Sequence, residues 1–190
     1  MYLSLNYSFA QSKNGMENYH TVGKATDYNW AAVLHHATKK GLYAEMRYNY
    51  EDINTVSIYG GKNFKTGDAI KISVTPMLGL LFGKYKGASF ATNFEMVYKK
   101  ITMSAQLQYT GSKEKRDDNF FYNWSEFIWQ PVEWLYGGIS VQQTKLYATE
   151  LKNETGIVVG FEMKKVIIPV YLFGPFTNSR NLMIGLNMEW

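Results

Sequence analysis

Histidine is the easiest residue in this chain to test for a catalytic role, because only three are present: His20, His35 and His36. A hydrolase with a Ser–His–acid triad would need one of them beside a serine and a carboxylate. His35 and His36 are adjacent in a stretch that alternates like a strand, so their side chains point to opposite faces and cannot share one site. Serines occur in nearly every alternating segment, so a nearby serine carries little information. We expect no enzyme, with a lipid hydrolase as a minor alternative.

Metal and phosphate sites have recognisable spacings, and the sequence shows neither. The stretch "GGKNFKTGD" lacks the Gly-Lys-Ser/Thr spacing of a phosphate-binding loop. The chain has 0 Cys, which excludes disulfides and thiolate metal sites. The charged stretch "KRDDN" is typical of a solvated loop, and the net charge of +4 comes from scattered lysines. We therefore predict no metal, no cofactor and no nucleic-acid partner.

The remaining polar side chains recur at every second position, opposite apolar ones. In "ITMSAQLQYT", Thr102 and each second residue after it are polar, whereas Ile101 and each second residue after it are apolar or aromatic. A period of two indicates a β-strand with two chemically different faces. Such polar faces would line an aqueous interior, and one charged pair, Glu45 and Arg47, can meet along its strand. The predicted lumen-lining residues are Glu45, Arg47, Lys71, Asn93, Glu95, Gln106, Gln108, Gln142, Glu162, Asn187 and Glu189.

This alternation covers almost the whole chain and predicts one all-β domain over residues 1–190. We count about twelve strands, or about ten if two weak segments are loops. The predicted strands are 2–9, 28–36, 42–50, 55–64, 70–80, 88–98, 101–110, 119–129, 135–144, 155–163, 166–173 and 181–190. Their length suits tilted strands that cross a bilayer, which need about 9–11 residues.

The connections between these strands alternate between short and long. Residues 37–41, 65–68, 99–100, 130–132 and 164–165 form the short set, and the longest connection is 11–27. An antiparallel up-and-down barrel with tight turns at one end and loops at the other gives this pattern. The connection 11–27 is the best candidate for a loop that folds into the lumen. The start, "MYLSLNYSFAQ", lacks a basic segment and a continuous apolar core, so we expect a mature domain that follows a removed targeting segment.

Two architectures give alternating strands, and the polar face decides between them. The outside of a soluble sheet usually carries dense Lys and Glu, whereas this polar face is rich in Ser, Thr, Asn, Gln and Gly. Amides and hydroxyls suit a confined wet lumen, so we expect the apolar face to contact lipid. Ile167, Tyr171 and Phe173, with Pro169, lie on the inward face and are expected to narrow the lumen.

The ending "NLMIGLNMEW" carries a resemblance to a known family. It alternates apolar residues and closes on an aromatic residue, and so resembles the C-terminal strand of Gram-negative outer-membrane β-barrels, although their usual last residue is Phe. The strand number is similar to that of small monomeric porins. The resemblance implies an outer-membrane location, contact with the bilayer and lipopolysaccharide, and recognition by the barrel-assembly machinery. The matching residues are Leu182, Ile184, Leu186, Met188 and Trp190.

The function that fits these features best is a passive pore or channel for small polar solutes, in a monomeric transmembrane barrel. The alternatives are a non-conducting structural or complex-bound barrel, an outer-membrane lipid-modifying enzyme and a soluble ligand-binding barrel. Carboxylates slightly outnumber cations among the predicted lumen residues, so we also expect a weak preference for cations.

Overall fold

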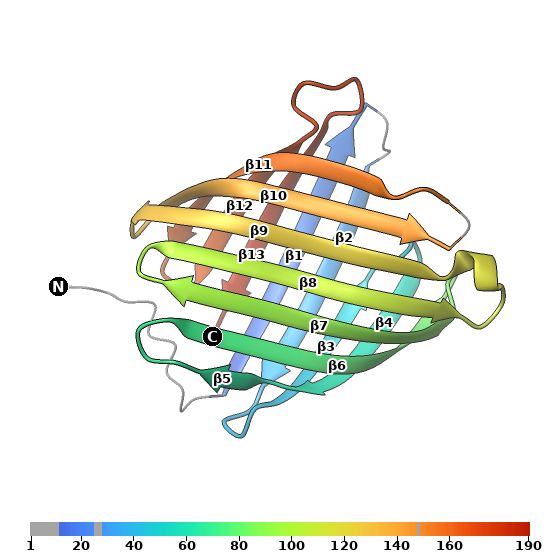
Figure 1. The fold of residues 1–190 in the computed structure, drawn as a ribbon, viewed down its shortest axis with the longest axis horizontal. Helices are drawn as coiled ribbons and strands as arrows, with labels where there is room; N and C mark the ends of the chain where they lie inside the picture. The colour runs from blue at the N-terminus through green and yellow to red at the C-terminus, as the bar shows by residue number, and fades with distance from the viewer. Residues whose placement is uncertain (1–11, 25–27, 148) are drawn as a thin grey trace.

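Alternating side chains place most of the chain in β-strands in the computed structural model, which describes residues 12–24, 28–147 and 149–190 (Figure 1). One short 3-10 helix, η1 (Arg116–Asp118), interrupts them. The strands are β1 (Lys13–Gly23), β2 (Asn29–Ala37), β3 (Leu42–Tyr48), β4 (Thr55–Lys62), β5 (Phe64–Thr66), β6 (Lys71–Gly83), β7 (Gly87–Tyr98), β8 (Ile101–Ser112), β9 (Phe120–Val132), β10 (Leu135–Leu146), β11 (Lys152–Met163), β12 (Val166–Phe173) and β13 (Asn181–Glu189).

The strands form one antiparallel sheet that closes on itself. Neighbours in the sequence are neighbours in the sheet, and β1 pairs with β13 to seal the barrel. β4 and β5 both pair with β6 and continue one register, from Gly61 opposite Met77 to Phe64 opposite Val74. They are therefore one interrupted strand, and the barrel has 12 strands. The predicted up-and-down barrel of about twelve strands is confirmed, and the alternative of about ten is wrong.

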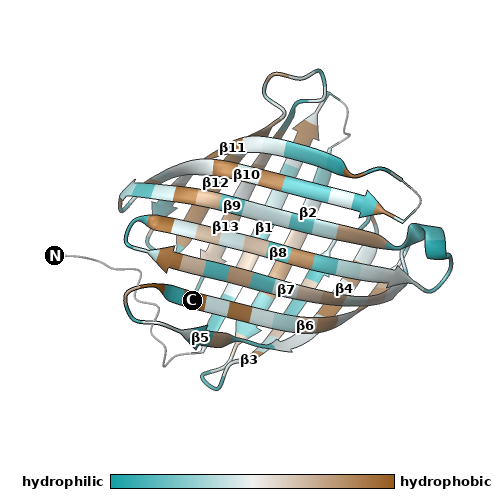
Figure 2. Ribbon diagram, in the orientation of Figure 1, coloured by the Kyte–Doolittle hydropathy of each residue, from teal (hydrophilic) through white to brown (hydrophobic). Residues whose placement is uncertain are grey.

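The two faces of the sheet differ as the sequence predicts. Leu107 and Ile184 on the outer surface are each 42% exposed, whereas the inward Gln108 is 2% exposed and Thr110 is 0% exposed. Along the strands, brown and teal bands alternate in Figure 2. The apolar side chains thus cover the outside of the barrel, and the polar side chains are directed inward.

The beginning of the barrel differs from the prediction. Residues 13–23 form β1, so the prediction that 11–27 is a loop is wrong. The predicted strand 2–9 lies outside the described residues. β1 was not predicted because its outward face carries Asn18 and His20, which interrupt the apolar pattern. Both are paired on the outer surface: Trp30 Nε1 donates to Asn18 Oδ1 at 3.4 Å, and His20 Nδ1 lies 2.8 Å from the Tyr28 hydroxyl.

The two ends of the barrel have different connections. The end with the short turns after β2, β5, β7, β9 and β11 is called the tight-turn end, and the opposite end is called the loop end. Lys99 and Lys164 begin two-residue turns and have φ of 54° and 56°. This left-handed conformation is costly for residues other than glycine. No helix among residues 12–24, 28–147 and 149–190 is long and apolar enough to cross a membrane.

Candidate functional site inside the barrel

The barrel contains a cavity of about 760 Å³, here called the chamber. Its lining includes Lys40 and Lys164 from two turns at the tight-turn end. At its deepest part it is lined by Arg47, Tyr50 and Trp124. The chamber therefore extends from the tight-turn end toward the middle of the barrel. Its volume lies within the range of about 300–1,000 Å³ that is usual for ligand pockets.

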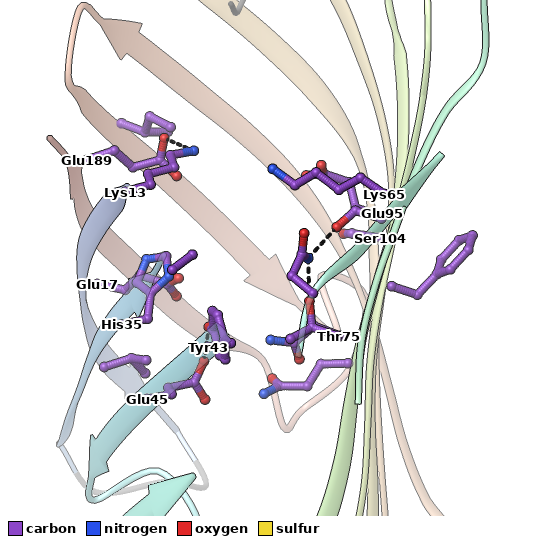
Figure 3. A pocket seen from close by; sticks show the side chains of 18 of the residues that line it. Lys13, Glu17, His35, Tyr43, Glu45, Lys65, Thr75, Glu95, Ser104 and Glu189 are labelled. Carbon is purple, nitrogen blue, oxygen red and sulfur yellow. Dashed lines mark hydrogen bonds and ion pairs between the residues drawn. The ribbon is translucent and has the colours of Figure 1, made fainter. Parts of the chain in front are cut away.

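Two facing walls carry the polar groups of the chamber (Figure 3). One wall, from β1 to β3, presents Glu17, His35 and Glu45. The opposite wall presents Glu95 from β7 and Ser104 from β8. Near the mouth, an ion pair of 2.5 Å joins Lys13 Nζ to Glu189 Oε2, which links β1 to β13 where the barrel closes.

A buried arginine closes the inner end of the chamber on one side. Arg47 is 0% exposed; its Nε contacts Glu45 Oε1 at 2.5 Å and its Nη1 contacts Glu51 Oε1 at 3.2 Å. The Nη1 group also donates to Gln108 Oε1 at 2.8 Å. β3 and β8 are not neighbours in the sheet, so this hydrogen bond crosses the lumen. We call the set Arg47, Glu45, Glu51, Gln106 and Gln108 the polar bridge.

The remaining members of the polar bridge hold the guanidinium in one place. With the Gln106 amide oriented so that its oxygen faces the guanidinium, this oxygen accepts from Arg47 Nη2 at 2.6 Å, and the amide nitrogen contacts the Tyr50 hydroxyl. The Arg47 Cζ atom also lies 4.3 Å from the ring centroid of Tyr59 and 4.7 Å from that of Tyr50. Glu51 lies in the connection between β3 and β4 and accepts from Ser57 Oγ at 2.8 Å. This connection therefore folds into the lumen.

An aromatic bridge crosses the lumen beside the polar bridge. The ring centroids of Tyr19 on β1 and Trp124 on β9 are 5.4 Å apart, and those of Trp124 and Tyr171 on β12 are 5.6 Å apart. Buried Phe173 and Met183 extend this cluster. The prediction that Tyr171 and Phe173 lie inward is confirmed. Together the two bridges narrow the lumen where the chamber ends.

The part of the barrel toward the loop end is packed with side chains. Thr55 and Ser57 are both 0% exposed, and the ring of Tyr85 packs 5.7 Å from that of Phe120. Tyr85 lies in the loop between β6 and β7 and donates its hydroxyl hydrogen to the Asp118 carbonyl at 3.0 Å. Partial burial is the main cause that raises the pKa of Tyr85 to about 12, and the nearby Asp118 carboxylate adds to it.

The structure brings most of the predicted lumen residues to the chamber or to its inner end. Seven line the chamber: Glu45, Arg47, Asn93, Glu95, Gln106, Glu162 and Glu189. Gln108 belongs to the polar bridge, and Asn187 lies 3.5 Å from the Tyr19 hydroxyl. Lys71 shares the inward face of β6 with buried Thr75 and Met77, and Gln142 shares the inward face of β10 with buried Ser140.

The residues of the C-terminal match lie on the last strand and beyond its end. Leu182, Ile184 and Leu186 are exposed on the outer face of β13. Met188 continues this face and pairs with Met16 of β1, and Trp190 is 55% exposed. The C-terminal strand thus forms the seam of the barrel.

The three histidines do not form a common site. His35 lines the chamber, where its ring lies over Gly15: a Cβ atom on this glycine would come within 1.8 Å of His35 Nε2. His36 points to the outer face and contacts Asn14 Oδ1 at 2.7 Å. No group of three or more His, Cys, Asp or Glu residues suited to a metal ion occurs in the described part of the chain.

The site residues that sequence reasoning missed include Glu17, Tyr19, Glu51, Trp124 and Glu126. Glu17 and Tyr19 lie on β1, where the inward alternation of Gly15, Glu17 and Tyr19 was available as a signal. Glu51 lies in a connection that looks solvated in the sequence. Glu126 lies on β9, whose two faces are both mixed.

Comparison with known proteins identifies the fold. No protein-family model matches the chain, and no curated protein matches its sequence. Among solved structures, the KdgM porin superposes with a TM-score of 0.67 at 9% identity, over 92% of this chain and 98% of that porin. The NanC porin superposes with a TM-score of 0.59 at 10% identity, over 92% of this chain and 97% of NanC. The chain has the porin β-barrel fold. OpdK of Pseudomonas aeruginosa, solved with vanillate, also matches, with a TM-score of 0.52 at 10% identity, over 87% of this chain and 57% of OpdK.

Proposed function

We propose that this chain is an outer-membrane channel for small polar solutes. The observation that carries the proposal is a polar chamber of about 760 Å³ inside a sealed barrel with an apolar outside. Exposed leucine and isoleucine side chains on this surface would be costly in water but suit acyl chains. Trp129 and Trp134, each 56% exposed near the tight-turn end, suit the headgroup level.

The proposed orientation follows from the lengths of the connections. Barrels of the bacterial outer membrane have short turns on the periplasmic side and longer loops outside. The chamber then opens toward the periplasm, and the loop end lies on the lipopolysaccharide side. In this arrangement the outer face of the barrel contacts lipid. The proposed state is a monomer, and the pairing of β1 with β13 within one chain supports it.

The two bridges support a channel for small solutes only. Arg47 and Trp124 reach partners across the lumen, so a solute must displace their side chains or pass beside them. The KdgM porin was also solved with disordered oligogalacturonate, and OpdK with vanillate. These similarities support transport as the proposed function.

The eleven predicted lumen residues are proposed to line the solute path, with the carboxylates giving a weak preference for cations. A reversal potential measured across a gradient of potassium chloride tests the sign of this preference. A potential that reports anion preference would reject it.

Conductance in a planar lipid bilayer tests the channel itself. We expect discrete current steps from the purified barrel. Ser104→Trp places a large ring on the chamber wall and should lower the step size, whereas Met103→Trp, on the adjacent outward position, should leave it unchanged. A barrel that inserts and folds but passes no ions would overturn the proposed function.

We also propose that the C-terminal strand acts as the assembly signal, with Trp190 as its last residue. Trp190→Ala should slow insertion in the presence of the assembly machinery, and Trp190→Phe should preserve it. Equal insertion rates for Trp190→Ala and the unchanged protein would reject this role.

A further inference from the structure

The inner half of the chamber, next to the two bridges, contains more negative than positive groups. Glu17 and Glu45 lie on one wall (Figure 3), and Glu126 projects from β9 near the aromatic bridge. Arg47 lies at the inner end and pairs with both Glu45 and Glu51. The six lysines of the described residues that also line the chamber lie on strands and turns at the tight-turn end: Lys13, Lys39, Lys40, Lys65, Lys164 and Lys165. Glu17 accepts a hydrogen bond of 2.8 Å from the Tyr19 hydroxyl, which is neutral. Thus the one guanidinium is shared by two carboxylates, and two further carboxylates face the cavity.

Hydrogen-bond acceptors in this region lack donors. Oε1 of Glu126 and Oδ1 of Asn93 are shielded from solvent and accept no hydrogen bond from the described residues, although Tyr171, Ser140 and Trp124 lie near the Glu126 carboxyl group. Both side chains belong to the chamber lining. An amide can rotate to present its nitrogen, but when Glu126 is ionised both of its carboxylate oxygens accept only. A buried acceptor without a donor costs about 1–3 kcal/mol, so a ligand that brings N–H groups would relieve it.

Aromatic faces lie beside the same acceptors. Trp124 is two residues from Glu126 on the inward face of β9, and its ring packs against Tyr171. Tyr43 lines the wall beside Glu45. A cation near an aromatic face gains about 0.5–2 kcal/mol, and indole is the best of these faces. Carboxylates, free acceptors and aromatic rings together match an ammonium group and disfavour a carboxylate.

We propose that the inner half of the chamber binds a small organic cation, a primary alkylammonium group, through Glu126 and Glu17. This inference rests on the proposed channel function and names the class of solute that the channel selects. The Glu126 side chain rotates to bring Oε1 to the chamber, where the ammonium donates to it and to Glu17, and the alkyl chain packs on Trp124. Lys39, Lys40, Lys164 and Lys165 at the mouth are exposed to water, where salt screens their repulsion over about 8 Å.

Calorimetric titration of the detergent-solubilised barrel tests binding without any need for ion flow. The three probes share one carbon skeleton: putrescine is the diamine, butanediol is neutral and succinate is the diacid. We expect saturable heat from putrescine and none from the other two. Saturable binding of succinate, or no binding of putrescine, would overturn the proposal.

Matched variants test where in the barrel the cation binds. Glu126→Gln keeps the shape and removes the charge, and should weaken putrescine binding about tenfold or more; Glu17→Gln should act in the same direction. Glu114→Gln, which changes an exposed carboxylate at the loop end, should leave binding unchanged. Circular dichroism verifies that each variant is folded. Equal affinity of Glu126→Gln and the unchanged barrel would place the cation elsewhere and reject the site.

Conductance separates this inference from the function on which it rests. A barrel that binds putrescine but passes no ions would leave the site intact and reject the channel. A barrel that conducts but does not bind putrescine would keep the channel and reject the cation site.

Discussion

Replacing Arg47 by methionine tests how the polar bridge contributes to stability. The change keeps most of the side-chain length but removes the guanidinium from a site where its exposure is 0% and that of its partners Glu45 and Glu51 is 4% and 1%. Two carboxylates would then be buried without a cation. Breaking a buried ion pair in this way costs about 3–5 kcal/mol. We expect the free energy of unfolding to fall by that amount.

The control is a solvent-exposed ion pair of the same length on the same barrel. Lys86 Nζ and Glu114 Oε1 lie 3.2 Å apart, as do Arg47 Nη1 and Glu51 Oε1, but the Lys86 and Glu114 side chains are 55% and 56% exposed. Exposed pairs contribute about 0–1 kcal/mol, so Lys86→Met should change stability by no more than that. The two pairs have the same length, but Arg47 is buried and also contacts Glu45 and Gln108. The difference in stability therefore measures the combined effect of burial and of these additional contacts.

Urea unfolding of the barrel in lipid vesicles, followed by tryptophan fluorescence, measures both variants. A second variant adds Glu45→Gln and Glu51→Gln to Arg47→Met and should recover most of the loss, because uncompensated charge is its main source. An Arg47→Met protein as stable as Lys86→Met would refute the reasoning. So would a triple variant that is less stable than Arg47→Met alone.

Three further predictions concern other parts of the barrel. Leu107→Lys places a charge on the outer surface and should cost about 2–4 kcal/mol in lipid vesicles if residue 107 lies near the bilayer centre, whereas Leu107→Met should cost less than about 1.5 kcal/mol in the same unfolding assay. Lys164→Gly should stabilise the barrel by about 1 kcal/mol because residue 164 has φ of 56°, while Lys165→Gly should not, as chemical denaturation will show. The pKa of Tyr85 is raised to about 12. The protonated hydroxyl therefore stabilises the folded barrel fully below the unfolded pKa of about 10, and this stabilisation is lost as pH rises toward 12. In a spectrophotometric titration, Tyr85→Phe should lack one high-pH tyrosine ionisation and keep the others.

The barrel could be predicted from sequence where one strand face is uniformly apolar. In residues 101–110 the alternation sets both the strand and its orientation, because a shift of one residue would place Leu107 inward and Gln108 in contact with lipid. β1 was not predicted because Asn18 and His20 point outward. The cost of placing these polar side chains against lipid is reduced by hydrogen-bonding partners, Trp30 on β2 and Tyr28 just before it, which no local pattern reveals.

The site could be predicted only in part for a related reason. Glu45 and Arg47 are two residues apart on one face, so their pairing along the strand was predicted and is confirmed at 2.5 Å. The contact of Arg47 with Gln108 depends on barrel diameter and register, which join residues 61 positions apart. Glu51 enters the lumen because Arg47 attracts it, and its own surroundings in the sequence resemble a solvated turn.

Single-cysteine labelling tests most directly the central claim that polar faces line a watery lumen and apolar faces meet lipid. The chain has 0 Cys, so each introduced thiol is unique. Ser104→Cys lies on the chamber wall, and Met103→Cys lies on the adjacent outward position, where methionine is 40% exposed. In lipid bilayers we expect a charged, water-soluble thiol reagent to modify Ser104→Cys and reduce the current, and to leave Met103→Cys unmodified. Rapid modification of Met103→Cys, with Ser104→Cys protected, would contradict the orientation and the transport function that depends on it.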